Sequence, residues 1–82
     1  DKARQATDAA NIRSAKAVAV AEYLTGTDSG KASTGTIYYD AAAGKLATGT
    51  KPTAYGQSTA NKDMVIQVSW DVNGAVTTTW VK

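Results

Sequence analysis

The 82-residue chain contains no cysteine, no histidine and no phenylalanine, and it has a single proline. Without cysteine no disulfide supports the fold, although this absence does not fix the compartment. Without histidine and cysteine, the usual general bases, thiol nucleophiles and imidazole metal ligands are missing. The five serines and twelve threonines have no identifiable base beside them, and no glycine-rich phosphate loop follows a strand. We therefore expect a protein that is not an enzyme and that uses no cofactor.

Charge and long apolar runs are also scarce. Nine Lys and Arg against seven Asp and Glu give a net charge of +2, spread along the chain, so no basic stripe predicts a dedicated nucleic-acid site. No apolar run reaches the ~18 residues typical of a membrane span. The chain opens on Asp1 without a charged and apolar signal segment, which we interpret as a processed or truncated amino end. Residues 1–82 are long enough for one small domain.

Alanine is what the first third of the chain has in excess. Residues 1–24 contain eight alanines and no glycine or proline, which predicts one helix over residues 1–25. At ~1.5 Å per residue the helix would be roughly 36 Å long. Gly26 is expected to end it in the left-handed conformation. Asp1 and Asp8 lie toward the positive end of the helix dipole, which is how we interpret these two carboxylates.

The predicted helix has two apolar stripes instead of one. The first has i, i+3, i+7, i+11 spacing and consists of Ile12, Ala15, Ala19 and Tyr23. The second is broader and consists of Ala6, Ala10, Ala17, Val20, Ala21 and Leu24. A surface helix normally has one apolar stripe, and one sheet can cover only one of these two. Either alanine fills exposed positions because it is a good helix former, or the second stripe is a subunit interface.

The loop at 25–36 follows the helix, and residues 36–82 predict two β-hairpins joined by a second loop at 49–62. In the first hairpin TIYYD (36–40) and KLAT (45–48) flank the turn AAAG, which Asp40 would open and Gly44 would close. A four-residue turn would place Tyr39 opposite Leu46 and Ile37 opposite Thr48.

The closing hairpin allows two registers. If Asn73-Gly74 alone formed the turn, Trp70 and Trp80 would lie on opposite faces of the sheet. If the loop is 72–74, with Gly74 as a left-handed bulge, Asp71 pairs with Ala75 and the two tryptophans share one face. The second register also places Ile66, Val68 and Val76 on that face, with Ile66 opposite Trp80 and Val68 opposite Thr78. Because a one-residue slip flips a whole strand, burial favours the second register.

Two features could carry binding. The segment TGTDSG (25–30) offers Asp28 with hydroxyls and carbonyls to a hard cation, but it lacks the repeated Asp and Asn of a calcium loop, and a solvated loop is the simpler interpretation. The tyrosines and tryptophans could form a glycan or nucleic-acid surface. Two tryptophans in the core are the commoner outcome.

The order of these segments resembles a known family. The helix ATDAANIRSAKAVAVAEYLTG, a Gly/Ser/Thr loop, IYYDAAAGKL and a Trp-bearing terminal hairpin resemble the globular part of a bacterial type IV pilin, most of all the cysteine-free pilins of Gram-positive bacteria. The resemblance covers essentially the whole chain and implies an α+β fold: one long amino-terminal helix packed on an antiparallel sheet of about four strands. The family's prepilin-peptidase site, modified amino terminus, nearby glutamate and apolar half-helix have no counterpart here. The resemblance therefore implies a chain that begins just downstream of them.

What the resemblance implies is a structural subunit of an extracellular filament that serves adhesion, twitching motility or surface attachment. The full-length precursor would lie in the cytoplasmic membrane, and prepilin peptidase and the pilus assembly machinery would be its partners. It would self-associate through the missing amino-terminal segment, so the 82-residue chain alone is expected to be monomeric. The alternatives are a competence or type II secretion pseudopilin and, from another class, a monomeric cell-surface module that binds glycan or DNA.

Overall fold

A computed structural model describes residues 1–26 and 29–82 of the chain. Over these residues it has one helix, α1 (Lys2–Thr25), and four strands, which are β1 (Ile37–Asp40), β2 (Lys45–Thr48), β3 (Val65–Trp70) and β4 (Val76–Val81). The strands form one sheet in the order β2-β1-β3-β4, with every neighbouring pair antiparallel. The predicted α+β arrangement is confirmed, and each element lies within a residue or two of its predicted bounds.

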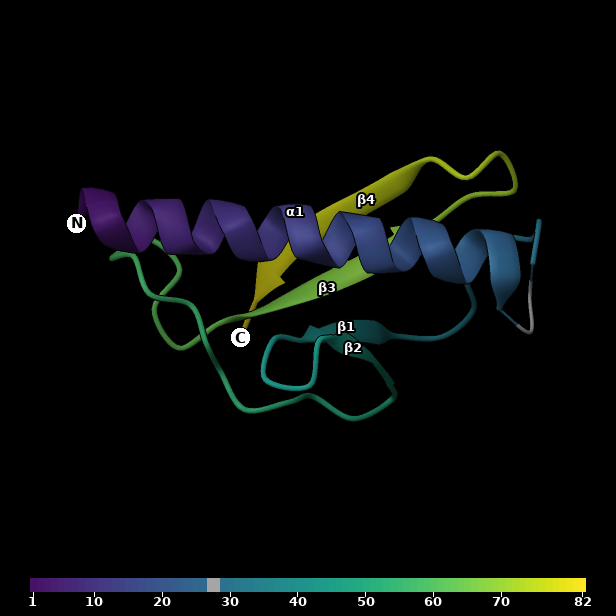
Figure 1. Cartoon of the computed structure of the whole chain (residues 1–82). Helices are drawn as coiled ribbons and strands as arrows, with labels where there is room; N and C mark the ends of the chain where they lie inside the picture. Colours follow the sequence, from purple (N-terminus) through teal and green to yellow (C-terminus); the bar gives the residue numbers. More distant parts are fainter. Residues whose placement is uncertain (27–28) are drawn as a thin grey trace.

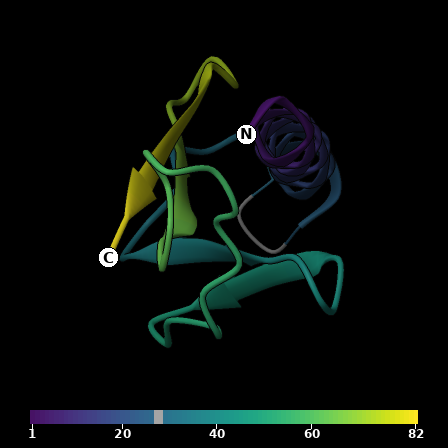
Figure 2. The ribbon, with the colours of Figure 1, turned by 90° about the vertical axis from the view of Figure 1, so that its left-hand side faces the viewer.

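The helix α1 runs along the whole length of the molecule, whose longest dimension is 38 Å (Figure 1). Seen along the helix, the sheet is strongly twisted, and α1 lies in the angle between the β1–β2 pair and the β3–β4 pair (Figure 2). The segment between β2 and β3, residues 49–64, contains no helix or strand and passes across the amino end of the helix. We call residues 49–64 the strap.

The first hairpin has the predicted register, with Tyr39 opposite Leu46 and Ile37 opposite Thr48. Asp40 opens its turn because Oδ1 accepts hydrogen bonds from the N–H groups of Ala42 and Ala43, at 3.0 and 3.1 Å. Gly44 closes it with φ +68°, a conformation that favours glycine. The turn residues therefore act as predicted.

The second hairpin has the bulged turn. The N–H of Asp71 donates to the carbonyl of Ala75, and Gly74 takes φ +83° while its own N–H donates back to Asp71. Val68 consequently pairs with Thr78, Ile66 pairs with Trp80, and both tryptophans lie on the face of the sheet toward α1, as predicted. Gly74 also packs beneath Tyr23, where an added Cβ would lie 2.8 Å from the ring.

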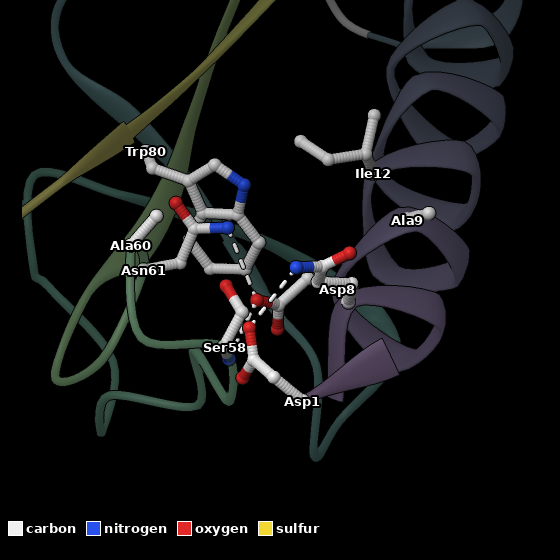
Figure 3. A pocket seen from close by; sticks show the side chains of 9 residues that line it. Asp1, Asp8, Ala9, Ile12, Ser58, Ala60, Asn61 and Trp80 are labelled. Carbon is white, nitrogen blue, oxygen red and sulfur yellow. Dashed lines mark hydrogen bonds between the residues drawn. The ribbon is translucent and has the colours of Figure 1, made fainter. Parts of the chain in front are cut away.

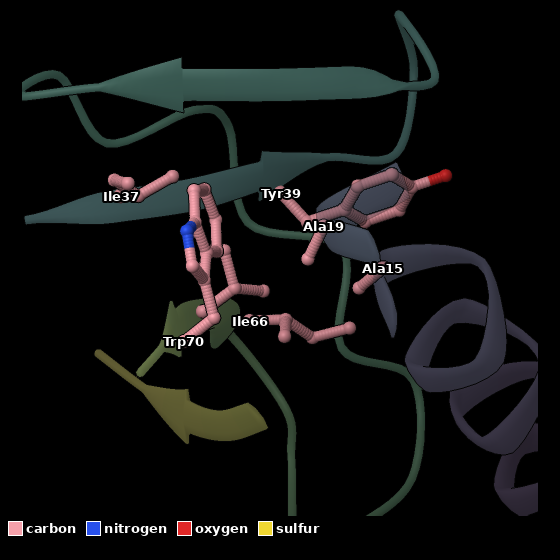
Figure 4. Close-up of a cluster of buried hydrophobic side chains, with 7 residues drawn as sticks. Ala15, Ala19, Ile37, Tyr39, Ile66 and Trp70 are labelled. Atoms are coloured by element: carbon pink, nitrogen blue, oxygen red, sulfur yellow. The ribbon is translucent and has the colours of Figure 1, made fainter. Parts of the chain in front are cut away.

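The core lies between α1 and the inner face of the sheet (Figure 4). Its buried members are Ala15, Ala19, Ile37, Tyr39, Ile66, Val68 and Trp70. The indole N–H of Trp70 donates to the carbonyl of Lys31 at 3.0 Å, so its one polar atom is satisfied. Trp80 is only partly buried, and its ring packs edge-on against Tyr55, with centroids 5.8 Å apart.

Gly26 ends α1, but the predicted left-handed conformation is wrong. Its φ of −75° and ψ of −179° are extended, and its N–H donates to the carbonyl of Glu22 at 2.7 Å. An added Cβ would lie 2.6 Å from that same carbonyl oxygen. Glycine is required here because the chain passes close to the last turn, a crowding that a sequence pattern does not reveal.

Candidate functional site

The strongest candidate site is the side of α1 that faces away from the sheet. We call it the outer face; all six of its predicted residues are exposed, namely Ala6, Ala10, Ala17, Val20, Ala21 and Leu24. Within it, the two larger apolar side chains, Leu24 and Val20, expose 62% and 43% of their surface. Because the sheet covers only the other stripe, the outer face is free to contact another molecule. Its use as a subunit interface stays a prediction.

One charged residue lies within the outer face. At 100° per residue, Arg13 falls between Ala10 and Ala17, so positions 6, 10, 13, 17, 20 and 24 follow the alternating spacing of four and three that is typical of a helix–helix seam. Arg13 is exposed and its guanidinium can accept no hydrogen bond, only donate. A helix that packed on this face with a carboxylate or carbonyl oxygen opposite Arg13 would satisfy these donors.

The opposite stripe lies against the sheet, as predicted. Ala15 and Ala19 have no exposed surface, and Ile12 and Tyr23 are partly buried against the core. With alanine at the two central positions the helix backbone approaches the sheet closely, since a larger side chain has no space there. The hydroxyl of Tyr23 donates to the carbonyl of Val72 at 2.7 Å and so joins the end of α1 to the turn of the second hairpin.

The sheet-facing stripe also contains a carboxylate, Asp8. Besides lying toward the positive end of the helix dipole, Asp8 is only 3% exposed and accepts hydrogen bonds from the strap. The donors are the N–H groups of Gln57 and Ser58, at 2.8 and 2.9 Å, and the side-chain amide of Asn61, at 3.0 Å. The sequence did indicate that Asp8 faces the sheet, because Asp8 lies four residues before Ile12 on the same stripe. Its partners, 49 to 53 residues away, were not predictable from spacing.

Burial raises the pKa of Asp8, but the hydrogen bonds from Ser58, Gln57 and Asn61 outweigh it, and the net pKa is lowered below its ordinary value. The carboxylate is therefore ionised at neutral pH. It fixes the strap to the helix.

A hollow of about 340 Å³ opens beside this junction (Figure 3). It is lined by Asp1, Gln5, Asp8, Ala9, Ile12, Ser58, Ala60, Asn61 and Trp80. Asp1 accepts two hydrogen bonds here: the amide of Gln5 donates to its Oδ2 at 3.0 Å, and the N–H of Thr59, a strap residue, donates to its Oδ1 at 3.3 Å. The carboxylates of Asp1 and Asp8 therefore hold the strap in place.

The strap is fixed at a second point by Tyr55. Its hydroxyl donates to the carbonyl of Tyr39 and accepts from the N–H of Ile66, which lies opposite Tyr39 in the sheet. The hydroxyl thus bridges β1 and β3 where a direct ladder bond would otherwise form. Burial raises the pKa of Tyr55 to about 12, which keeps the hydroxyl a hydrogen-bond donor.

Two other carboxylates act in the hairpin turns. Asp40 and Asp71 organise the two hairpin turns, and Asp71 Oδ1 accepts from the N–H groups of Asn73 and Ala75. Among residues 1–26 and 29–82, no three Asp, Glu, His or Cys side chains gather as metal ligands would. The suggested cation loop depends on Asp28, which lies outside the described residues.

Comparisons with protein-family models, with curated proteins and with solved structures found no match to this chain. Within the described part of the chain, α1 is not apolar enough to cross a membrane.

Proposed function

We propose that this chain is the globular part of a type IV pilus subunit, a structural protein of an extracellular filament. The observation that carries the proposal is the outer face of α1. A 24-residue helix that packs on its own sheet by one stripe leaves a second, alanine-rich stripe uncovered. Small side chains allow two helices to approach closely, and close helix packing is what a filament core made of helices requires.

The position of α1 also supports a filament subunit. The helix begins at Lys2 on the rim of the molecule, beyond the end of the sheet (Figure 1). A preceding apolar helical segment would lengthen the rod without displacing a described element. Such a segment would anchor the precursor in the cytoplasmic membrane and supply the main self-association contacts, with prepilin peptidase and the pilus assembly machinery acting on the precursor.

The outer face by itself is too weak to drive assembly. Each methyl removed from water contributes only ~0.8 kcal/mol, whereas association costs ~4–15 kcal/mol in lost translational and rotational freedom. The 82-residue chain should therefore sediment as a monomer at micromolar concentration. Spontaneous filaments of this chain would show that the globular part carries its own assembly contacts.

Electron microscopy of the parent cells tests the function. Long surface filaments that disappear when the gene is deleted, and return with the gene, support the pilus subunit. Short fibres confined to the envelope, with loss of competence or secretion, would indicate the pseudopilin instead. If filaments are unaffected while glycan or DNA binding to the cells is lost, the chain is a monomeric binding module and the proposal is wrong.

A further inference from the structure

The outer edge of β4 is open. The strand β4 has one neighbour, β3, and no described segment lies on its other side (Figures 1 and 2). In an antiparallel ladder the backbone groups of successive residues point alternately to the two sides. Because Asp71 bonds to Ala75 within the hairpin, residues 77, 79 and 81 point their N–H and C=O groups toward β3. Those of Val76, Thr78 and Trp80 point outward.

This edge lacks the usual protection against strand addition. The opposite edge, β2, has only four residues and begins with Lys45, and short, charged edges resist pairing. The edge strand β4 has six residues, VTTTWV, all β-branched or aromatic, with no charge, no proline and no glycine. The two edges of one sheet therefore differ, and only β4 is a good template for another strand.

We propose that the β4 edge binds the β4 edge of a second copy of this chain. In the antiparallel arrangement a two-fold axis passes through Thr78, so that Thr78 faces Thr78 of the second copy and Val76 faces Trp80 of the second copy. Every outward N–H then meets an outward C=O, and the two sheets become one sheet of eight strands.

The side chains suit this register. Thr77 would lie opposite Thr79 of the second copy on the outer face of the sheet, and the Val76–Trp80 pairs would lie on the inner face. Threonine pairs and aromatic–β-branched pairs are both favourable across strands. At the ends Lys82 would face Gly74 of the second copy, so no like charges oppose one another. A shift by two residues would lose the valine–tryptophan pairs.

The proposed contact is weak, and its two-fold symmetry limits it to a dimer. Three hydrogen-bonded residue pairs give about six backbone hydrogen bonds, and one strand edge buries less than the ~1,200 Å² of a stable interface. Pairing should appear only toward millimolar concentration, so it is consistent with the monomer that we predict at micromolar concentration. A two-fold contact ends at a dimer and cannot extend a filament. If the proposed pilus function holds, arrayed copies would instead join two filaments side by side.

Heteronuclear NMR on the 82-residue chain tests the pairing. Raising the concentration from micromolar to millimolar should shift the amide signals of Val76, Thr78 and Trp80 progressively and slow diffusion to that of a dimer. Thr78→Pro removes an outward N–H at an edge, where proline is tolerated, and should abolish these changes. Thr48→Pro is the matched control because Thr48 points outward at the β2 edge, and it should leave them intact.

A second measurement uses the wild-type chain alone, so it decides the question even if Thr78→Pro fails to fold. In a mixture of isotope-labelled and unlabelled chains, the Hα of Thr77 should show an intermolecular contact with the Hα of Thr79, since non-hydrogen-bonded pairs bring Cα atoms within ~4.5 Å. Absence of any concentration dependence would overturn the proposal. So would shifts confined to the outer face of α1, or particles that grow beyond a dimer. None of these results depends on whether the parent protein forms pili.

Discussion

The two faces of α1 are built from nearly the same amino-acid types, yet they have opposite surroundings. The sheet-facing stripe has alanine at its centre, at Ala15 and Ala19, and both residues are completely buried. The outer face also has alanine at its centre, at Ala17 and Ala21, and both are exposed. Alanine composition therefore does not decide which face is covered. The larger residues differ instead in what they contact: Ile12 and Tyr23 reach the core and the second hairpin, whereas Val20 and Leu24 remain exposed.

The two faces of α1 also differ in the side chains that they tolerate. A larger side chain at Ala19 would meet the close-packed side chains of the core, whereas one at Ala17 would extend into solvent. The covered stripe even includes Asp8, whose charge is stabilised by three hydrogen-bond donors. The outer face contains no such buried and hydrogen-bonded charge. Its two large apolar residues, Val20 and Leu24, remain exposed.

The sharpest contrast between the faces comes from the same substitution at neighbouring positions. Ala19→Glu places an unpaired carboxylate in the core, which costs several kcal/mol and is comparable with the ~5–15 kcal/mol that stabilises a small domain. We expect Ala19→Glu to be unfolded at 25 °C and Ala17→Glu to change the free energy of unfolding by less than ~0.5 kcal/mol. Circular dichroism and urea unfolding measure both. A folded Ala19→Glu variant would mean that the faces are not distinct.

The covered carboxylate gives the next largest effect. Asp8→Asn keeps the shape but removes the charge and one acceptor oxygen, and hydrogen bonds to charged groups contribute ~1.5–3 kcal/mol. We expect a loss of about 2–3 kcal/mol at pH 7. The exposed Asp63 provides the control, since Asp63→Asn should change the free energy of unfolding by less than ~0.5 kcal/mol.

The pH dependence of this effect has a defined sign. The folded pKa of Asp8 lies below its ordinary value of 3.8, so its contribution is fully present above that pH. It is lost as the pH falls through the folded pKa. The difference between wild type and Asp8→Asn should therefore shrink in acid. A difference that stays constant from neutral pH into acid would mean that the charge of Asp8 does not stabilise the strap.

Replacing a larger apolar residue on each face by alanine compares how much its burial contributes to the free energy of unfolding. Ile12→Ala should cost about 1–2 kcal/mol, below the ~2–5 kcal/mol of a fully buried site, because Ile12 is only partly buried. Val20→Ala, on the outer face, should cost less than ~0.5 kcal/mol. Equal losses at the two positions, measured by urea unfolding, would show that the wrong stripe has been assigned to the sheet.

Within the covered stripe, the smallest expected loss is at its carboxyl end. Tyr23→Phe removes the hydrogen bond to the carbonyl of Val72 but keeps the ring over Gly74. Because the bond is solvent-exposed, we expect a loss of about 0.5–1 kcal/mol. Amide exchange should become faster at Val72 to Ala75 and stay unchanged in the strap. Faster exchange in the strap instead would mean that the two ends of α1 are coupled.

Local patterns in the sequence predicted most of the fold. Turn chemistry at Asp40 predicted the register of the first hairpin, burial of one face predicted that of the second, and helical spacing separated the two faces of α1. The sequence did not reveal the partners of Asp8 or the bridging hydroxyl of Tyr55, because these contacts join segments far apart in the chain. The close passage at Gly26 was missed for a related reason, since it depends on where the following loop runs. The outer face could be predicted as exposed, but its occupant could not, because a single chain contains only half of an interface.

If the outer face of α1 contacts neighbouring subunits, as we propose, Ala17→Glu in the proposed pilin precursor tests the contact directly. Ala17 is exposed and adjoins Arg13 on this face, so the substitution leaves the fold intact but places a charge where helices would pack. Thr7→Glu is the control, since Thr7 is exposed at the border of the face. Electron microscopy should find no pili on cells with Ala17→Glu, despite normal amounts of folded protein, and normal pili with Thr7→Glu. Normal pili with Ala17→Glu would contradict the account.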